Sequence, residues 1–292
     1  MNNINRNGLA QFFTDCLDLI KFKILIFSLI TILIGVVCSG VSFSDFGYDR
    51  LFFLILGSFF IYSAAAALNH ALEVQTDFLM ERTKNRPIVS KRFNFYWVVS
   101  LSVISAFIGF FILYIYVNSV VALLSLFILI SYDFIYTPLK KMTWLNTFFG
   151  AFPGAMPILC GWYASTYDTN LLTYLLFALF YFWQLPHFFS IAWLSKDAYM
   201  NAGLKMISAN DTLGSRTSMV TFVTAIIFIV VNLSIFILGF EGLIYFLFMV
   251  LSNGFFFKFS LDFFRSPSNV TAKKVMLMSL IYPILIFVLV FF

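Results

Sequence analysis

The sequence predicts an all-α polytopic membrane protein with nine transmembrane helices. Of its 292 residues, 62% are hydrophobic and only 11% are charged, whereas a typical soluble domain has about 25% charged residues. The mean hydropathy is +0.96. Apolar stretches of about 20 residues, the length that a helix needs to cross a bilayer, recur along the whole chain. These observations place the chain among integral membrane proteins.

The nine candidate spans follow one another in close succession. They cover approximately residues 22–41, 51–71, 95–117, 119–137, 147–165, 171–193, 218–240, 242–261 and 273–292. The fifth span is rich in residues that disrupt helices, namely Gly150, Pro153, Gly154, Pro157 and Gly161. We therefore expect it to be kinked or broken, because such helices persist where protein or a cavity satisfies the freed backbone groups.

The distribution of lysine and arginine predicts the orientation. With the N-terminus in the cytoplasm, Arg50 is the one basic residue of 18 that falls on the outer side. Positive residues accumulate in cytoplasmic loops, so this asymmetry predicts N-terminus inside and C-terminus outside. The clustering of positive charge beside the spans also argues against nucleic acid as a partner of this basic chain.

The connections predict where function lies. The two long ones, about 72–94 and 194–217, are both on the cytoplasmic side, so we expect the functional residues there. The chain is predicted to be a single membrane-embedded domain, 1–292, that begins with a polar cytoplasmic segment, 1–20, without the features of a removable signal peptide. Three widely spaced cysteines, without a CxxC pattern, fit neither a disulfide framework nor a zinc site.

The segment 68–92, LNHALEVQTDFLMERTKNRPIVSKR, carries the clearest chemical signal. Asn69, Glu73 and Asp77 are spaced four residues apart, and four helical residues turn about 400°, so their oxygen-bearing side chains form a stripe on one helix face. A basic cluster follows, made of Arg82, Lys84, Arg86, Lys91 and Arg92. Acids that can hold a hard cation, beside guanidinium groups, predict a site for a metal-bound polyphosphate.

Three further groups of polar residues lie near the same face. Tyr132, Asp133, Tyr136 and Lys140 occur where the fourth span ends; an aromatic belt with a snorkelling lysine is the alternative interpretation. Asp197 lies in the second long connection, and Asn201 follows it at the same four-residue spacing, within an otherwise ordinary polar loop.

Gln184 and His187 flank Pro186 inside an apolar span. Polar side chains at membrane depth are functional candidates. The imidazole of His187 is suited to be a base, a proton relay or an axial ligand of a porphyrin iron, although it could also simply bond a neighbouring helix.

The acidic string followed by MERTKNRP closely resembles the first acidic motif of the UbiA-type intramembrane prenyltransferases. The later strings YTPLKK, GAFPGAMPILCGW, FWQLPHFFSIAWL and KDAYMNAGLKM are similar, in order and spacing, to the heme-farnesylating branch of that family. The resemblance extends from about residue 20 to the C-terminus, and the ordered set is far more specific than any one string.

The resemblance implies nine transmembrane helices around a central cavity. It also implies transfer of a farnesyl group from farnesyl diphosphate to a vinyl group of heme B, with addition of water, to give heme O. Mg²⁺ would support release of the diphosphate. The product serves heme–copper oxidases, so heme A synthase or oxidase assembly proteins become candidate partners, and a bacterial cell (inner) membrane becomes the expected location.

The resemblance also assigns roles to particular residues. Catalysis and metal binding would fall to the acidic motifs: Asn69, Glu73, Asp77 and Asp197. The diphosphate would be bound by basic residues: Arg82, Lys84, Arg86 and Lys140. The heme would be positioned by His187, Gln184 and Tyr136. Ala198 stands where the family frequently has a second acid, which leaves the number of magnesium ions open.

Two alternatives stand beside this hypothesis. A UbiA-type transferase with another aromatic acceptor, such as a quinone or chlorophyll precursor, would share the diphosphate site. A transporter with broken helices and polar residues at the membrane midplane is the other; the clustering of ionisable residues at one face argues against it.

Overall fold

The computed structural model describes residues 2–238 and 242–291, with the backbone alone at 2–7, 245, 287 and 289–291. Within these residues the chain is helical and contains no strand. The elements of the N-terminal half are α1 (Asn2–Leu19), α2 (Phe22–Cys38), α3 (Phe43–Phe46), α4 (Tyr48–Leu72), α5 (Val74–Phe78), α6 (Phe95–Tyr116), α7 (Ser119–Ile130), η1 (Ser131–Tyr136) and α8 (Thr137–Met142). Those of the C-terminal half are α9 (Asn146–Ala155), α10 (Pro157–Ser165), α11 (Leu171–Leu194), α12 (Lys196–Asn201), α13 (Ser215–Ile237), α14 (Leu243–Arg265), α15 (Asn269–Ser279) and α16 (Ile281–Phe291).

The helices confirm the all-α membrane fold, but not the count of nine spans. Among the described residues, 7 helices are long and apolar enough to cross a membrane, or up to 8 if one bent pair forms a single span. That pair is α1 and α2, which meet at an angle of 50°. The chain turns between them at Lys21, whose φ of 49° lies in the left-handed region.

Two predicted spans fail this test of length as single helices. The first, α2, has 17 residues and passes only together with α1, and the fifth is divided into α9 and α10. The break falls at Met156, and Pro157 opens the new helix. A proline lacks the amide hydrogen that a continuing helix would need and its ring collides with the preceding turn. The expectation of a broken helix over 147–165 is therefore confirmed, with the break where two short helices follow each other end to end.

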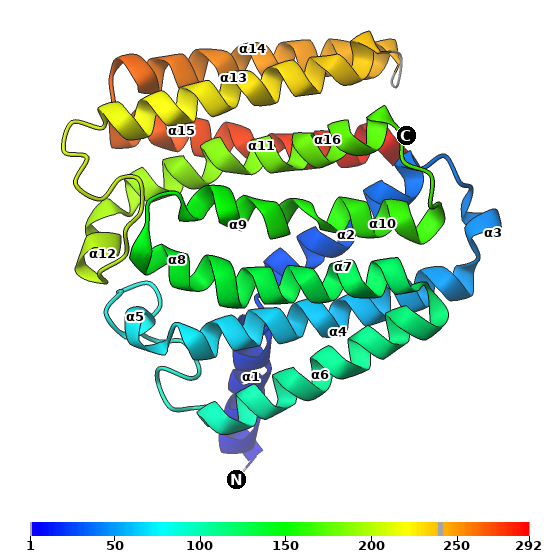
Figure 1. Cartoon of the computed structure of the whole chain (residues 1–292). Helices are drawn as coiled ribbons and strands as arrows, with labels where there is room; N and C mark the ends of the chain where they lie inside the picture. The colour runs from blue at the N-terminus through cyan, green and yellow to red at the C-terminus, as the bar shows by residue number, and fades with distance from the viewer. Residues whose placement is uncertain (1, 239–241, 292) are drawn as a thin grey trace.

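The helices run roughly side by side, and their short connecting elements gather at the ends (Figure 1). In the C-terminal half α11 packs against α9, α13 and α15, whereas in the N-terminal half α4 packs against α6. The contact of α2 with α10 links the two halves. At one end of the bundle lie α5, α8 and α12, on the left of Figure 1, so the two long connections approach each other in space.

Glycines allow α2 and α10 to approach each other closely. A Cβ atom added at Gly161 would overlap the Ile32 carbonyl oxygen, and one added at Gly35 would overlap the Ile158 carbonyl oxygen. Small residues permit this backbone-to-backbone approach in membrane proteins, where packing and not hydrophobicity drives helix association. The close approach holds the broken α10 against an uninterrupted helix.

Gly161→Ala is expected to destabilise the protein by about 1–3 kcal/mol, because overpacking forces two backbones apart. The measurement is the midpoint of thermal unfolding in detergent. Gly254→Ala is the matched control, since a Cβ at this helical position would meet nothing within 4 Å and alanine favours a helix by roughly 0.5–1 kcal/mol. Equal midpoints for the two variants would contradict the proposed role of the α2–α10 contact.

Candidate active site

A cluster of ionic side chains occupies the end of the bundle where α4, α5 and α8 meet. Glu73 follows α4 directly, Asp77 belongs to α5, and Lys140 belongs to α8. Arg86 comes from the loop that follows α5, and Lys21 from the break between α1 and α2. Segments far apart in the sequence thus supply the charges, and no single segment contains the site.

Each of the two acids is paired with a base from another segment. Lys140 Nζ lies 2.6 Å from Glu73 Oε1, and Arg86 Nη1 lies 2.5 Å from Asp77 Oδ2. The side chains of Glu73 and Lys140 are each 13% exposed, and that of Asp77 is 5% exposed. Buried charges need partners of opposite sign, and the two pairs hold both carboxylates at the same end of the bundle.

The backbone carries the acidic stripe as the sequence predicts, with one distortion. The Glu73 amide donates to the Asn69 carbonyl at 3.0 Å, and the Asp77 amide donates to the Glu73 carbonyl at 2.8 Å. These are helical i to i+4 bonds. The helix nevertheless ends formally at Leu72, because Glu73 has φ −97° and ψ 6°. The distortion turns α5 away from the axis of α4.

The two carboxylates experience opposite electrostatic balances. Burial alone would raise the pKa of Glu73, but the charges of Lys140 and Lys21 outweigh it and hold this pKa below its usual value. For Asp77, burial outweighs the nearby Arg86 and the pKa is raised. Desolvation and neighbouring charge are distinct causes of a pKa shift. Neighbouring charge dominates at Glu73 and desolvation at Asp77.

Lys21 is a site residue that the sequence analysis counted only as a charge that sets orientation. Its ammonium group donates to Asn69 Oδ1 and, at 3.2 Å, to the Tyr132 hydroxyl. Asn69 Nδ2 in turn donates to Thr137 Oγ1 at 2.8 Å. A lysine next to the start of an apolar span is weak evidence for a functional site, because most such lysines extend to the membrane interface.

An aromatic wall flanks the ion pairs. The rings of Tyr132 and Tyr136 lie 5.7 Å apart, and Lys140 Nζ lies 4.4 Å from the centre of the Tyr136 ring. On its other side Tyr136 contacts Gly150 of α9, where a Cβ would come within 2.5 Å of the ring. The π-helical segment η1 presents these side chains, and such segments are frequent at functional sites.

The remaining predicted residues lie outside this network of hydrogen bonds and ion pairs. Arg82 and Lys84 are exposed, and Lys84 pairs with Glu81 at 2.6 Å. Asp197 is exposed on α12, and among the described residues it makes neither a side-chain hydrogen bond nor an ion pair. The structure therefore brings together Asn69, Glu73, Asp77, Arg86, Lys140 and Tyr136, whereas Asp197 forms no hydrogen bond or ion pair with them.

Gln184 and His187 face different neighbours of α11. Gln184 Nε2 donates to the carbonyl oxygens of Phe180 and Ala151, and Gln184 Oε1 fills the space that a side chain at Gly154 would need. His187 Nδ1 lies 2.8 Å from Ser279 Oγ on α15, and its ring stacks on Trp183. Their assignment to the heme stays a prediction.

Two buried polar side chains in this region have no partner among the described residues. Neither carboxylate oxygen of Asp133 in η1 makes a hydrogen bond, and the same is true of both ring nitrogens of His70 in α4. Leaving buried polar groups unsatisfied costs about 1–3 kcal/mol each. Asp133 therefore belongs to the candidate site as an acid that sequence analysis noted without giving it a role.

The donor chemistry of the cluster fits magnesium held together with a phosphate ligand. Among the described residues, no three His, Cys, Asp or Glu side chains are placed to hold a metal ion by themselves. Asn69, Glu73 and Asp77 offer oxygen atoms, and Mg²⁺ usually binds one or two carboxylates together with waters and substrate phosphates. Lys21, Arg86 and Lys140 supply the positive charge that a diphosphate needs.

This fold and this cluster define a membrane-embedded prenyltransferase. The profile of the UbiA prenyltransferase family matches residues 28–281, and the chain belongs to that family. The chain is 35% identical over 238 residues to "Protoheme IX farnesyltransferase" of Solibacter usitatus (strain Ellin6076), covering 82% of each chain. It is 33% identical over 278 residues to the protein of the same name from Koribacter versatilis (strain Ellin345), covering 93% of this chain and 89% of that one.

Solved structures agree in fold. A structure of digeranylgeranylglyceryl phosphate synthase superimposes with a TM-score of 0.77 at 15% identity and covers 95% of this chain and 98% of that one. A UbiA homologue from Archaeoglobus fulgidus bound to DMAPP and Mg²⁺ gives a TM-score of 0.67 at 13% identity and covers 94% and 99%. At this level of identity the likeness establishes the shared fold.

Lys21→Met is expected to lower prenyl transfer about tenfold or more. The variant leaves buried Asn69 Oδ1 without its donor, and losing a charged hydrogen-bond partner costs roughly 1.5–3 kcal/mol. The measurement is the initial rate of transfer by purified protein. Lys23→Met is the control, because Lys23 is exposed and its side chain forms no hydrogen bond or ion pair with another described residue. Equal losses in both variants would remove Lys21 from the site.

Proposed function

We propose that this chain transfers the farnesyl group of farnesyl diphosphate to a vinyl group of heme B, with addition of water, and releases heme O and diphosphate. The observation that carries the proposal is the buried cluster in which Glu73 pairs with Lys140 and Asp77 with Arg86. Family membership supports prenyl transfer, and the name protoheme IX farnesyltransferase, shared by relatives at 31–35% identity, supports heme B as the acceptor.

The basic residues of the cluster stabilise the leaving group. When the C–O bond of the allylic diphosphate breaks, its electron pair remains on the diphosphate, where negative charge increases. Lys21, Arg86 and Lys140 are held where such charge develops, and preorganised cations lower the barrier most at developing charge. Asn69, Glu73 and Asp77 would hold Mg²⁺, which acts as a Lewis acid toward phosphate oxygens.

The aromatic residues next to the cluster suit the other fragment. Ionisation leaves positive charge on the farnesyl carbon, and the faces of Tyr132 and Tyr136 can stabilise a cation in front of them. The vinyl π electrons of the porphyrin form the new C–C bond to this carbon. Water then adds to the carbon next to the macrocycle and loses a proton, which gives the hydroxyethylfarnesyl side chain.

The surroundings of the site suit two substrates with apolar bodies and charged ends. The hydrocarbon chain and the porphyrin can stay in the membrane region, while the diphosphate and the propionates reach the charged end of the bundle. The excess of basic residues at this end supports a cytoplasmic location for the site in a bacterial cell (inner) membrane. Heme A synthase or oxidase assembly proteins would then receive the product.

Mass analysis of hemes from a host that lacks its own farnesylating enzyme tests the proposal. Cells that express the chain are expected to contain farnesylated, hydrated heme, and cells that express Asp77→Asn are expected to contain none. The substitution removes a charge from the metal–diphosphate site, so turnover should fall by at least about 2–3 orders of magnitude. Blotting of membranes controls for expression. Near-normal heme O production by Asp77→Asn would contradict the role of this acid.

The aromatic-acceptor alternative is tested with the same protein. Purified enzyme is supplied with farnesyl diphosphate and either heme B or 4-hydroxybenzoate. Turnover of 4-hydroxybenzoate alone would overturn heme B as the acceptor and would leave the diphosphate site intact.

His187→Ala is expected to raise the KM for heme B more than the KM for farnesyl diphosphate. The reason is that His187 of α11 contacts Ser279 and Trp183 and forms no hydrogen bond with the ion pairs that would bind the diphosphate. Steady-state kinetics with each substrate varied in turn measures the two constants. Equal increases in both, or a larger increase for farnesyl diphosphate, would exclude His187 from the heme site.

A further inference from the structure

An apolar groove runs along the outer side of α4, α6 and α7, where Leu68, Ala71 and Leu72 lie on a different face of α4 from Asn69. It has a volume of about 490 Å³ and is lined by apolar residues alone, among them Leu72, Phe95, Val103, Phe107 and Leu126. Phe107 is 61% exposed. In a bilayer such a groove is filled by hydrocarbon, and its shape suits a bound acyl chain.

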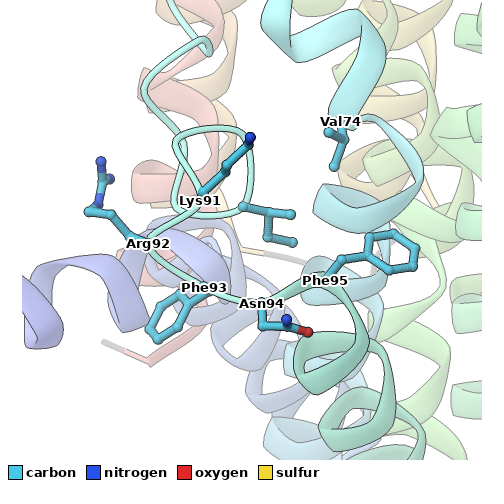
Figure 2. Close-up of a pocket in the computed structure, with 7 residues that line it drawn as sticks. Val74, Lys91, Arg92, Phe93, Asn94 and Phe95 are labelled. Carbon is cyan, nitrogen blue, oxygen red and sulfur yellow. The ribbon is translucent and has the colours of Figure 1, made fainter.

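A second hollow with a basic rim adjoins the groove. Its volume is about 450 Å³, and its lining includes Lys91, Arg92 and Asn94 together with Phe95, the residue that both hollows share. Figure 2 shows Lys91 and Arg92 on the loop above Phe93 and Asn94, with Phe95 on the side of α4. Polar and apolar spaces thus meet at one aromatic side chain.

The protein neutralises one of the two positive charges of this rim and leaves the other. Arg92 forms a bidentate pair with Asp15 of α1, at 2.7 and 2.9 Å. The Lys91 ammonium group is exposed and has no hydrogen-bond or ion-pair partner among the described residues. One positive charge is therefore free for a ligand at the mouth of an apolar groove.

Aromatic residues beside the hollow mark the level of the membrane surface. Tyr96 and Trp97 open α6 and are 77% and 69% exposed. Exposed tyrosine and tryptophan at the end of a span typically lie among lipid headgroups. Lys91 is then at headgroup depth, where each basic side chain contributes about 1 kcal/mol to the attraction of anionic lipid.

We propose that the two hollows form a binding site for one anionic phospholipid, with its phosphate at Lys91 and an acyl chain in the groove. A single unpaired lysine suits the one negative charge of a phosphodiester, whereas a diphosphate would require several cations. The site is separate from the catalytic one, because Leu68 and Leu72 of α4 line the groove while Asn69 and Glu73 belong to the ion-pair cluster.

Photo-crosslinking tests the proposal with the whole chain in vesicles. One set contains phosphatidylcholine alone and the other equal parts of phosphatidylcholine and phosphatidylglycerol, and in each the photoreactive group sits on an acyl chain of the lipid under test. Adducts of phosphatidylglycerol are expected in the peptide around residues 95–111 and should outnumber those of phosphatidylcholine. Equal labelling by both lipids would overturn the selection by charge.

Variants separate the headgroup contact from the groove. Lys91→Gln should lower phosphatidylglycerol labelling about fivefold, the factor expected from one lysine near an anionic surface, and Lys91→Arg should preserve it. Lys141→Gln is the control, because Lys141 is an exposed lysine at the same end of the bundle with no side-chain partner among the described residues. Val103→Trp should lower labelling by both lipids, since it fills the groove.

Two outcomes would assign the groove to another occupant and overturn the proposal. Displacement of the label by excess farnesyl diphosphate would make the groove part of the substrate site. Adducts that join two copies of the chain would make it an interface between protomers. Because the readout is lipid labelling, it does not depend on whether the chain farnesylates heme.

Discussion

The ion pairs of Glu73 with Lys140 and of Asp77 with Arg86 organise one whole end of this molecule. Isolated charges at such depth would be unstable, so each acid determines where the chain segment that carries its partner must lie. Lys140 places α8 against the end of α4, and Arg86 folds the loop after α5 back over Asp77. Lys21 then joins this arrangement to the α1–α2 break through Asn69 and Tyr132. The result is a cluster of paired charges at one end of an otherwise apolar bundle.

The same arrangement explains how a chain with few charged residues can form a chemical site. A buried carboxylate is stable there when a cation lies close to it. The cations lie close because they are located at helix ends and breaks. Lys140 comes from the last turn of α8, which follows the π-helical turn η1, and Lys21 comes from the bend between α1 and α2. Irregular backbone of this kind is tolerated at membrane depth where protein or a cavity surrounds it. Function and departure from regular helix therefore coincide in this protein.

Much of this could be predicted from the sequence, because hydropathy and spacing are local properties. The apolar stretches gave the helices, the proline and glycine content of 147–165 gave the broken span, and the spacing of Asn69, Glu73 and Asp77 gave the acidic stripe. The nine-span count was not confirmed, since a helix divided at Met156 is short on either side of the break. Lys21 was not predicted as a site residue, because its role depends on a tertiary contact with Asn69, which lies 48 residues further along the chain. Asp197 and His187 matched the strings of the family, yet their places relative to the ion pairs depend on tertiary packing that no local pattern encodes.

The loop between α5 and α6 contacts two distant parts of the chain. Arg86 forms an ion pair with Asp77 of α5, and Arg92 forms an ion pair with Asp15 of α1. The N-terminal helix is thereby connected, through the loop, to Asp77 of the candidate site, although it contributes no acid to the stripe of Asn69, Glu73 and Asp77. Shortened chains that start at α2 would lose both the Arg92–Asp15 ion pair and Lys21. A bulky tag fused ahead of α1 would disturb the Arg92–Asp15 ion pair. The amino-terminal side is therefore a poor place for a tag when the protein is prepared for activity measurements.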